Sequence, residues 1–274
     1  MPADASLQEQ ILRDYPRLGP EDRFTFRCGK DLECFTRCCR DVSIVLTPYD
    51  VLRMKKALGI TSTEFLEHYA LLPFAPEQKI PVVLLKMDPE VKQCPFVGPD
   101  GCSIYAHRPW ACRMYPLGVA DPKHPSPADR RFHFLLQEEL CRGHGQGKVY
   151  AVREWLEQEG IEEYDMMGAP FRDLMLDDFW ERGQELTPQQ VDMYFMACYD
   201  LDRFRRFVFE TKFLELFEVD EARVEAMRSD DLELLEFGMY WLRFSLFHQK
   251  TLKIKRSAAE AHRRAMERQA NPNG

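Results

Sequence analysis

The spacing of apolar residues gives the chain two halves of different character. From residue 148 onward glycine and proline are few, and apolar side chains recur at the intervals of an amphipathic helix. Two of the helix starts carry capping signals, because Thr187 is followed by proline and then Gln190, and Asp230 is followed by Glu233. The pattern predicts helices over 148–158 and 170–182, a helix from residue 188 that continues toward Phe217, and a long helix that begins after Asp230.

The first half alternates between short apolar or β-branched runs and turn residues. Thr47, before Pro48, and the Thr61–Glu64 pair each mark a helix start, and Gly59 is suited to end the first of these helices. Gly98-Pro-Asp-Gly101 predicts a tight turn. The ranges expected to form strands are 24–28, 42–46, 81–87, 116–119 and 131–136.

These patterns predict a mainly α protein of the α+β class with two domains. Residues 1–147 are expected to form a small, irregular cysteine-rich domain with a few short antiparallel strands. Residues 148–274 are expected to form a helical domain with a basic C-terminal tail. A chain of 274 residues is long enough for a substantial core, so the cysteines are not needed to staple a small fold.

Composition indicates which binding partners and which cellular compartment to expect. The net charge of −8 argues against general nucleic-acid binding, although residues 250–268 carry seven basic residues and two acidic ones. The first residues show no basic segment followed by an apolar run, and no apolar stretch is long enough to span a membrane. We therefore expect a cytoplasmic protein, in a compartment that keeps thiols reduced.

The cysteines carry the main chemical signal. Eight of the nine fall between residues 28 and 141, in loops that also contain glycine or proline. Clustered cysteines in a reducing compartment are typical of metal ligands rather than disulfides. Cys198 lies instead on the apolar stripe of a predicted helix, where a buried core residue is expected. The candidate metal ligands are Cys28, Cys34, Cys38, Cys39, Cys94, Cys102, Cys112 and Cys141.

The adjacent pair Cys38–Cys39 is awkward for a single ion, because neighbouring side chains point apart in an extended chain. One of the two could serve a second site or only pack. The eight thiols allow two four-cysteine sites, or one cluster with spare thiols. No spacing matches the ferredoxin runs, and no close CxxC pair indicates a zinc ribbon, so the sequence leaves the metal open between iron and zinc.

Residues beside the cysteines suggest how a metal group would be held. Five of the eight cysteines have an adjacent arginine, whose charge would lower thiol pKa values and offset the negative charge of a thiolate site. Glycines alternate after Cys141, and they would let backbone amides approach a cluster or an anion. The predicted cofactor-binding residues are Gly143, Gly145 and Arg113.

Other polar and aromatic residues near the cysteines have simpler interpretations. His107, His133 and His144 could each replace a thiolate ligand, but core or surface roles are favoured. Arg108 and Arg113 could hold an anionic substrate near the metal, with charge compensation as the alternative. The aromatic residues Tyr105, Trp110 and Tyr115 are expected to pack over the cluster.

Five elements of the first half follow one another in a characteristic order. They are Cys34-Phe-Thr-Arg-Cys38-Cys39, Leu46-Thr-Pro-Tyr-Asp50, Cys94-Pro-Phe96, Cys102-Ser-Ile-Tyr105 and Arg108-Pro-Trp-Ala-Cys112-Arg-Met-Tyr-Pro116. These elements resemble the YkgJ-type cysteine-cluster family, which is described as a zinc- or iron-chelating domain. The resemblance covers about residues 24–147, and the first cysteines are more widely spaced here than in the family's CxxCxxCC pattern.

The resemblance implies a metalloprotein. Because the family includes flagellin lysine N-methylases that look iron–sulfur dependent, it favours an iron–sulfur cluster, most simply [4Fe-4S], and a redox or group-transfer enzyme that acts on a small molecule or a protein. The alternatives are a zinc protein with a structural metal and a helical interaction module, or a metal carrier. The sequence shows no glycine-rich strand-to-helix motif for S-adenosylmethionine.

Overall fold

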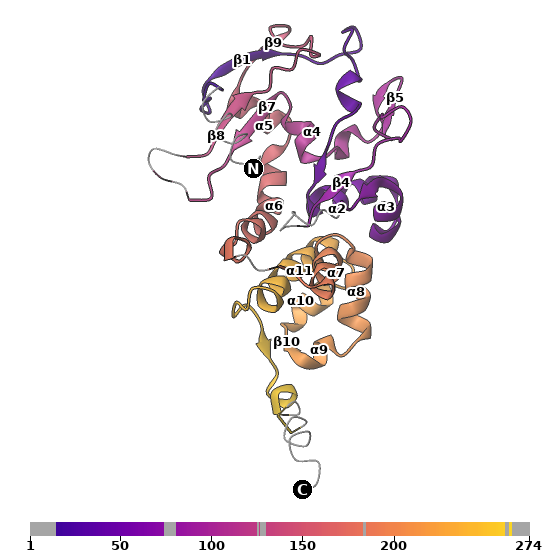
Figure 1. Ribbon diagram of the computed structural model, residues 1–274, viewed down its shortest axis with the longest axis vertical. Helices are drawn as coiled ribbons and strands as arrows, with labels where there is room; N and C mark the ends of the chain where they lie inside the picture. Colours follow the sequence, from indigo (N-terminus) through magenta and orange to yellow (C-terminus); the bar gives the residue numbers. More distant parts are fainter. Residues whose placement is uncertain are drawn as a thin grey trace. The chain divides into compact units, whose positions relative to one another are not determined.

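The computed structural model describes residues 15–73, 81–124, 126, 130–182, 185–260 and 263–264. They fall into two compact units, shown in Figure 1. The cysteine unit comprises the described residues of Met1–Ala57 and Leu84–Gly168, and the helical unit those of Leu58–Val83 and Ala169–Gly274. The division after Gly168 falls within a helix, and residues 58–83 belong to the helical unit. A functional boundary at residue 147 stays a prediction.

The cysteine unit contains short strands and short helices joined by long loops. Its strands are β1 (Arg23–Phe26), β2 (Val45–Leu46), β4 (Val83–Leu85, which begins one residue before the unit), β5 (Val97–Gly98), β6 (Gly101–Cys102), β7 (Leu117–Ala120), β8 (Phe132–Leu135) and β9 (Lys148–Ala151). Its helices are η1 (Arg37–Cys39), α2 (Pro48–Leu58), η2 (Tyr105–His107), α4 (Trp110–Met114), α5 (Val152–Gln158) and the first half of α6 (Ile161–Met175).

Three antiparallel pairs organise this unit: β1 with β9, β5 with β6, and β7 with β8. The β1–β9 pair matters most for the site, because its register sets Phe26 opposite Lys148 at the end where the first cysteine loop leaves β1. Alternate residues of β1 face the core, as a half-buried strand requires. The core cluster behind the pair consists of Phe24, Phe26, Met114, Leu117, Val152, Trp155 and Ile161.

The helical unit is built mainly from amphipathic helices. Its elements are α3 (Ser62–Tyr69), β3 (Ala70–Leu71), the second half of α6, η3 (Asp178–Arg182), α7 (Pro188–Cys198), α8 (Leu201–Glu210), α9 (Phe213–Leu216), β10 (Phe217–Glu218), α10 (Glu221–Ala226), α11 (Asp231–Ser245) and β11 (Lys253–Ile254). The antiparallel pair of β10 and β11 sets Phe217 opposite Ile254.

The core of the helical unit lies between α7, α8 and α11. Gly238 on α11 allows close packing, because a Cβ there would lie 2.6 Å from the Ala197 carbonyl oxygen. The rings of Phe204 and Trp241 stack with centroids 5.5 Å apart. Ser62 Oγ donates to Asp202 Oδ2 at 2.6 Å, which fixes α3 to α8. The apolar stripes expected on these helices are therefore core.

The predicted helix starts are confirmed where a capping residue marks them. Thr61 and Thr187 each form a capping box with the residue three positions later, and Asp230 accepts from the Leu232 amide. Gly59 follows α2 with φ of 67°, the left-handed conformation expected after a helix. The fold class is also confirmed, since the described chain is mainly helical with small antiparallel sheets.

Three predicted helix extents are wrong. Residues 148–151 are strand β9, because pairing with β1 overrides the local helical pattern, and the helix begins at Val152. The second helix begins at Ile161 and ends at Met175, and η3 follows it. The helix after Thr187 does not continue toward Phe217: it ends at Cys198, and Asp200 caps a new helix by accepting from the Arg203 amide.

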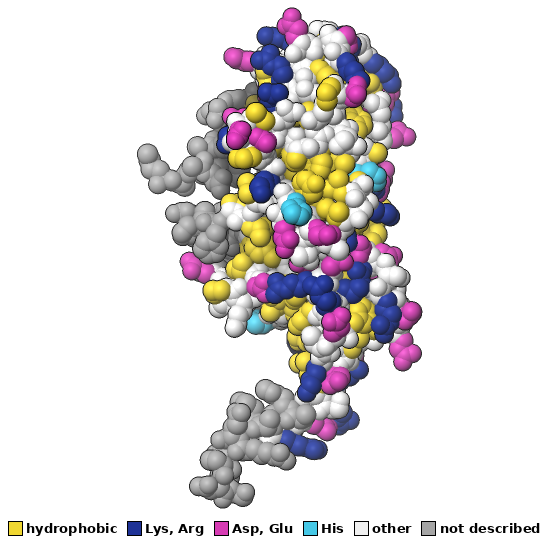
Figure 2. Space-filling view, turned by 90° about the vertical axis from the view of Figure 1, so that its right-hand side faces the viewer, with side chains coloured by type: hydrophobic (Ala, Val, Ile, Leu, Met, Phe, Trp, Pro, Cys, Tyr) yellow, Lys and Arg dark blue, Asp and Glu magenta, His cyan; other side chains and the backbone are white. Residues whose placement is uncertain are grey.

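No helix in the described ranges is both long and apolar enough to cross a bilayer. On the face drawn in Figure 2, acidic and basic side chains are interspersed with apolar ones.

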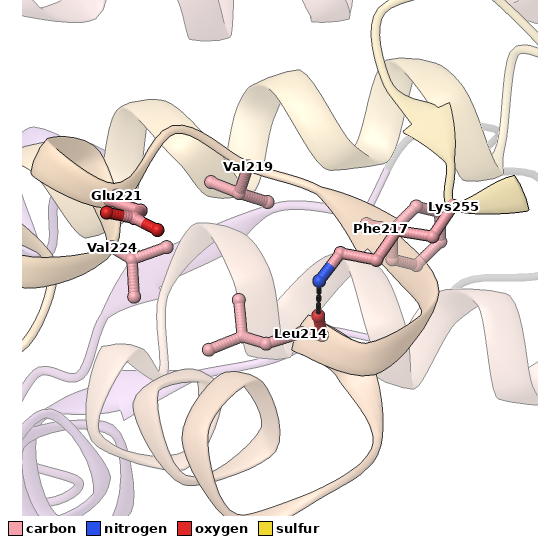
Figure 3. A pocket seen from close by; sticks show the side chains of 6 residues that line it. All are labelled: Leu214, Phe217, Val219, Glu221, Val224 and Lys255. Atoms are coloured by element: carbon pink, nitrogen blue, oxygen red, sulfur yellow. Dashed lines mark hydrogen bonds between the residues drawn. The ribbon is translucent and has the colours of Figure 1, made fainter. Parts of the chain in front are cut away.

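A pocket of about 270 Å³ lies within the helical unit (Figure 3). The cationic group in the lining of this pocket is the Lys255 amine. It donates to the Leu214 carbonyl at 2.7 Å and is therefore already engaged. The lining contains no cysteine and consists of Leu214, Phe217, Val219, Glu221, Val224 and Lys255.

Candidate metal centre

All eight clustered cysteines lie in the cysteine unit, and none of the nine cysteines forms a disulfide. Cys28 and Cys38 are exposed, Cys34 is buried, and the other five are half-buried. In the described part of the chain, no three histidine, cysteine, aspartate or glutamate side chains are already placed as a set of metal ligands. The eight thiols nevertheless fall into two groups of neighbours. Neither group forms a closed coordination shell.

The first neighbourhood, the Cys28 group, contains Cys28, Cys34, Cys38 and Cys141. Beyond the β1–β9 pair, the Arg27 amide donates to the Gly143 carbonyl at 3.2 Å, so the loop after Cys141 runs beside the chain that enters Cys28. The Arg142 amide donates to Cys34 Sγ at 3.2 Å. Cys28 interacts with the other three thiols, and together with burial they raise its pKa.

The second neighbourhood, the Cys112 group, contains Cys39, Cys94, Cys102 and Cys112. The Cys94 amide donates to the Cys39 carbonyl at 2.9 Å. The β5–β6 hairpin pairs Val97 with Cys102, and the Val97 amide donates to the Cys94 carbonyl at 3.1 Å. Cys112 on α4 interacts with Cys94 and Cys102, and Cys39 interacts with Cys112 and Cys94. The tight turn expected at Gly98–Gly101 is confirmed, because it joins β5 to β6.

Backbone amides point at several of these sulfurs. The Phe96 amide donates to the sulfur of Cys94, and the Ile104 amide donates to that of Cys102, each two residues along the chain. The Gly29 amide does the same for Cys28. Such bonds stabilise a thiolate, since they favour the charged form of the sulfur. These bonds therefore offset part of the effect of burial, which raises the pKa values of the three cysteines.

The two groups meet at Cys38 and Cys39. The Cys39 S–H donates to Cys38, and this bond lowers the pKa of Cys38 to about 7 while it raises the pKa of Cys39. Both residues lie in the single turn η1, and their other sulfur neighbours belong to different groups.

The remaining thiols of the Cys112 group favour the protonated form when no metal is present. Burial raises the pKa of Cys112 to about 12, with the nearby Cys94 as the next contribution. Burial also raises the pKa values of Cys94 and Cys102. Arg108 acts in the opposite direction on Cys102 and Cys112, which supports charge compensation rather than substrate binding as its role.

A buried polar framework positions α4, the helix that carries Cys112. The Asp50 carboxylate is fully buried and accepts from the Trp110 amide at 2.7 Å and from the Thr47 amide at 2.8 Å. Arg108 pairs with Glu159, and both side chains are buried. No local pattern marks Asp50 or Glu159 for these roles, because Trp110 and Arg108, their partners, are 60 and 51 residues away.

Arg113, predicted to bind a cofactor, is part of the same framework. Its guanidinium donates to the backbone carbonyls of Ala106 at 2.5 Å, Glu159 at 2.7 Å and Arg108 at 3.1 Å. All three bonds fix the chain around α4. Direct cofactor contact by Arg113 stays a prediction.

Two other arginines that flank cysteines also have partners of their own. Arg27 pairs with Asp31 at 2.5 Å, and Arg40 donates to Gln93 Oε1 at 2.9 Å. The charge that favours thiolates in the Cys112 group comes from Arg108, which is not next to a cysteine in sequence.

The glycines after Cys141 have distinct roles. A Cβ at Gly143 would lie 2.2 Å from the Arg27 carbonyl oxygen, and one at Gly147 would lie 2.7 Å from the Arg27 side chain. Gly145 has a φ of 73° and open space around its Cα. Glycine is therefore required at position 143 because the Arg27 backbone of the same chain passes close to it. Contact of Gly143 and Gly145 with a cofactor stays a prediction.

Gly143→Ala is expected to destabilise the cysteine unit by about 1–3 kcal/mol, because the new methyl group meets backbone that cannot move freely. It should also weaken metal retention, since the Arg27–Gly143 contact places Cys141 beside Cys28. Thermal unfolding and metal content would be measured together. The control is Gly98→Ala, where a Cβ would meet nothing within 4 Å. Equal effects of the two substitutions would contradict the close-approach argument.

The histidines lie beside groups other than thiols. His107 is near Arg53 and Arg113, which with burial lower its pKa, and burial and Arg131 lower the pKa of His133. The ring of His144 packs 5.3 Å from that of Phe26. Cys198 is fully buried against Met239, with the sulfurs 3.8 Å apart, which confirms its core position.

The donor chemistry of the two groups fits a thiolate-bound metal. Each group offers four sulfurs, the number that closes a tetrahedral zinc site or holds a [4Fe-4S] cluster. Beside Cys141, the Tyr115 hydroxyl donates toward the Cys141 sulfur, and burial together with this contact raises the pKa of Tyr115.

Comparison with known proteins agrees with this donor set. A search of curated proteins and a search of solved structures each found no match. A scan against family models found one that spans all eight clustered cysteines, and it confirms the family resemblance inferred from the sequence. Residues 27–144 match the CxxCxxCC family, described as a "putative zinc- or iron-chelating domain".

Proposed function

We propose that this protein is a cytoplasmic metalloprotein that binds an iron–sulfur cluster, or iron, through the cysteines of its first unit. The observation that carries the proposal is that eight thiols from three distant loops lie in one unit and interact with one another. The family match over residues 27–144 supports the same chemistry.

Three features support an iron–sulfur cluster as the leading candidate. Four thiolates can hold a [4Fe-4S] cluster, amide hydrogen bonds to sulfur tune such clusters, and a buried arginine offsets their negative charge. The exposure of Cys28 and Cys38 leaves the first group open to a small molecule or a protein partner. A redox or group-transfer role is the corresponding proposal for activity.

Zinc is the second candidate, and the number of donors supports it. Four cysteines without a further ligand make the closed tetrahedral site that is typical of structural zinc. In that case the helical unit would be an interaction module. A metal carrier would instead release its metal to a chelator without unfolding of the helical unit.

The test is a metal analysis and a visible spectrum of the full chain purified without oxygen. Brown protein with several irons and inorganic sulfide per chain is the expected result. Colourless protein with zinc would replace the cluster with the structural-zinc candidate. Protein without any metal, even after incubation with zinc or with iron and sulfide, would overturn the proposal.

Metal binding is expected to strengthen as the pH rises. The raised pKa values of Cys112, Cys94 and Cys102 keep these thiols protonated at neutral pH, and binding requires the thiolate. For each proton released on binding, the apparent association constant for the metal increases about tenfold per pH unit.

Calorimetric zinc titration in two buffers of different ionisation enthalpy measures this proton release. We expect the release from Cys112→Ser to be smaller than that from the unmodified chain. A release near zero, with an affinity that does not change between pH 6 and pH 8, would show that the buried thiols are not the ligands.

A further inference from the structure

We propose that the eight cysteines build two separate metal centres, and that the boundary between them runs through the adjacent pair Cys38–Cys39. One centre takes Cys28, Cys34, Cys38 and Cys141, and the other takes Cys39, Cys94, Cys102 and Cys112. This inference rests on the proposed metal binding and adds the number of centres and the ligands of each.

The first step is the way the backbone brings Cys141 to Cys28. The antiparallel β1–β9 pair ends at Phe26 and Lys148, and the bridge between Phe26 and His144 continues it. The loop from Cys141 to Gly147 therefore lies along the chain that leads into Cys28. The bond from the Arg142 amide to Cys34 Sγ then joins the third sulfur to the same place.

The second step is a separate set of contacts that gathers the other four sulfurs. An isolated antiparallel bridge pairs Arg40 with Gln93, so the neighbouring residues Cys39 and Cys94 lie side by side in the second group. The β5–β6 hairpin returns the chain to Cys102. The buried Asp50 holds the start of α4 through the Trp110 amide and so fixes the helix that carries Cys112. None of these contacts involves the β1–β9 pair.

The third step is the turn that separates the two neighbours. Cys38 and Cys39 lie in η1, where three residues complete one turn, so successive side chains leave the axis about 120° apart. The two cysteines contact each other, but their further sulfur neighbours differ: Cys38 interacts with Cys28, and Cys39 interacts with Cys112 and Cys94. One turn thus gives one sulfur to each group, and each group reaches the four donors that a closed centre needs.

The experiment compares variants within and across the groups. Purified full-length chains are loaded with zinc alone and, separately, with ferrous iron and sulfide without oxygen, and bound metal is measured per chain. The single variants are Cys141→Ser and Cys112→Ser. The doubles within a group are C28S/C141S and C94S/C112S, and the double across groups is C112S/C141S. Cys198→Ser is the control outside both groups, and far-UV circular dichroism reports the fold.

Two zinc ions per unmodified chain are expected. Each single variant should keep half of the metal, each double within a group should keep the same half, and the double across groups should keep none. Loss of all metal in both single variants would overturn the two-centre inference in favour of one shared centre. An unmodified chain that binds no metal would instead overturn the proposed function itself.

A second measurement avoids substitutions, in case a variant does not fold. The unmodified chain is loaded with half of the zinc it can bind, and free thiols are alkylated and identified by peptide mass spectrometry. Protection of the two groups as separate sets of four, with Cys38 and Cys39 in different sets, is expected. Protection of Cys38 and Cys39 always together would overturn the assignment.

Discussion

Removal of the metal is expected to expose the backbone of residues 27–41 and 92–112 to hydrogen exchange and to leave α7, α8 and α11 unchanged. In residues 27–41 only Leu32 and Cys34 are buried, so little apolar contact holds this loop. A ligand present at 1,000 times its dissociation constant contributes about 4 kcal/mol, which corresponds to about 1,000-fold slower exchange where opening requires its loss. The cysteine loops should therefore show by far the largest change.

Hydrogen exchange measured by mass spectrometry, with and without a chelator, checks this expectation. The helices of the second unit serve as the internal control, because they bury their own core of Tyr194, Phe204 and Phe237. Equal protection of the cysteine loops with and without chelator would show that their order does not depend on metal. A matching loss of protection in α7 and α11 would show that the metal supports the whole chain.

Glu159→Ala is expected to destabilise the cysteine unit by about 3–5 kcal/mol. The substitution removes the partner of the buried Arg108 and leaves a guanidinium without its counter-charge. The same guanidinium donates to the Tyr105 carbonyl and lies 3.7 Å from the centroid of the Tyr105 ring, so its displacement would disturb the segment between Cys102 and Cys112. Metal content should fall together with stability.

Urea unfolding, monitored by hydrogen exchange at amides of the cysteine unit, measures the change in the free energy of unfolding. Glu157→Ala is the matched control, because it removes an exposed carboxylate two residues earlier and should change the free energy of unfolding by less than about 0.5 kcal/mol. Glu159→Gln keeps an oxygen acceptor for Arg108 and should lie between the two. If the alanine variants at 157 and 159 were equally stable, the buried pair would not support the site.

Helix starts could be predicted from the sequence where a single capping side chain determines them. Thr61 and Thr187 cap their own helices through bonds that span three residues. The pattern failed at residues 148–151, whose structure depends on a strand more than 120 residues earlier. It also missed the helix start at Ile161, although Gly160, with φ of 65°, gives a signal there that could have been used.

Features of the candidate site that depend on nearby residues could likewise be predicted, whereas those that depend on distant residues could not. The cysteines themselves, and the turn that joins Cys94 to Cys102, could be predicted from neighbouring residues. The division into two groups could not, because it depends on bridges such as Arg40–Gln93 and on carboxylates whose burial no local pattern reveals. The sequence alone allows two sites or one cluster, and the contacts favour two sites.

The contact between Cys38 and Cys39 also has a consequence for how the protein tolerates air. Oxidation of this adjacent pair to a disulfide would take one sulfur from each group at the same time. A single oxidative event at one turn of the chain would then open both groups, and reduction of that one bond would restore both.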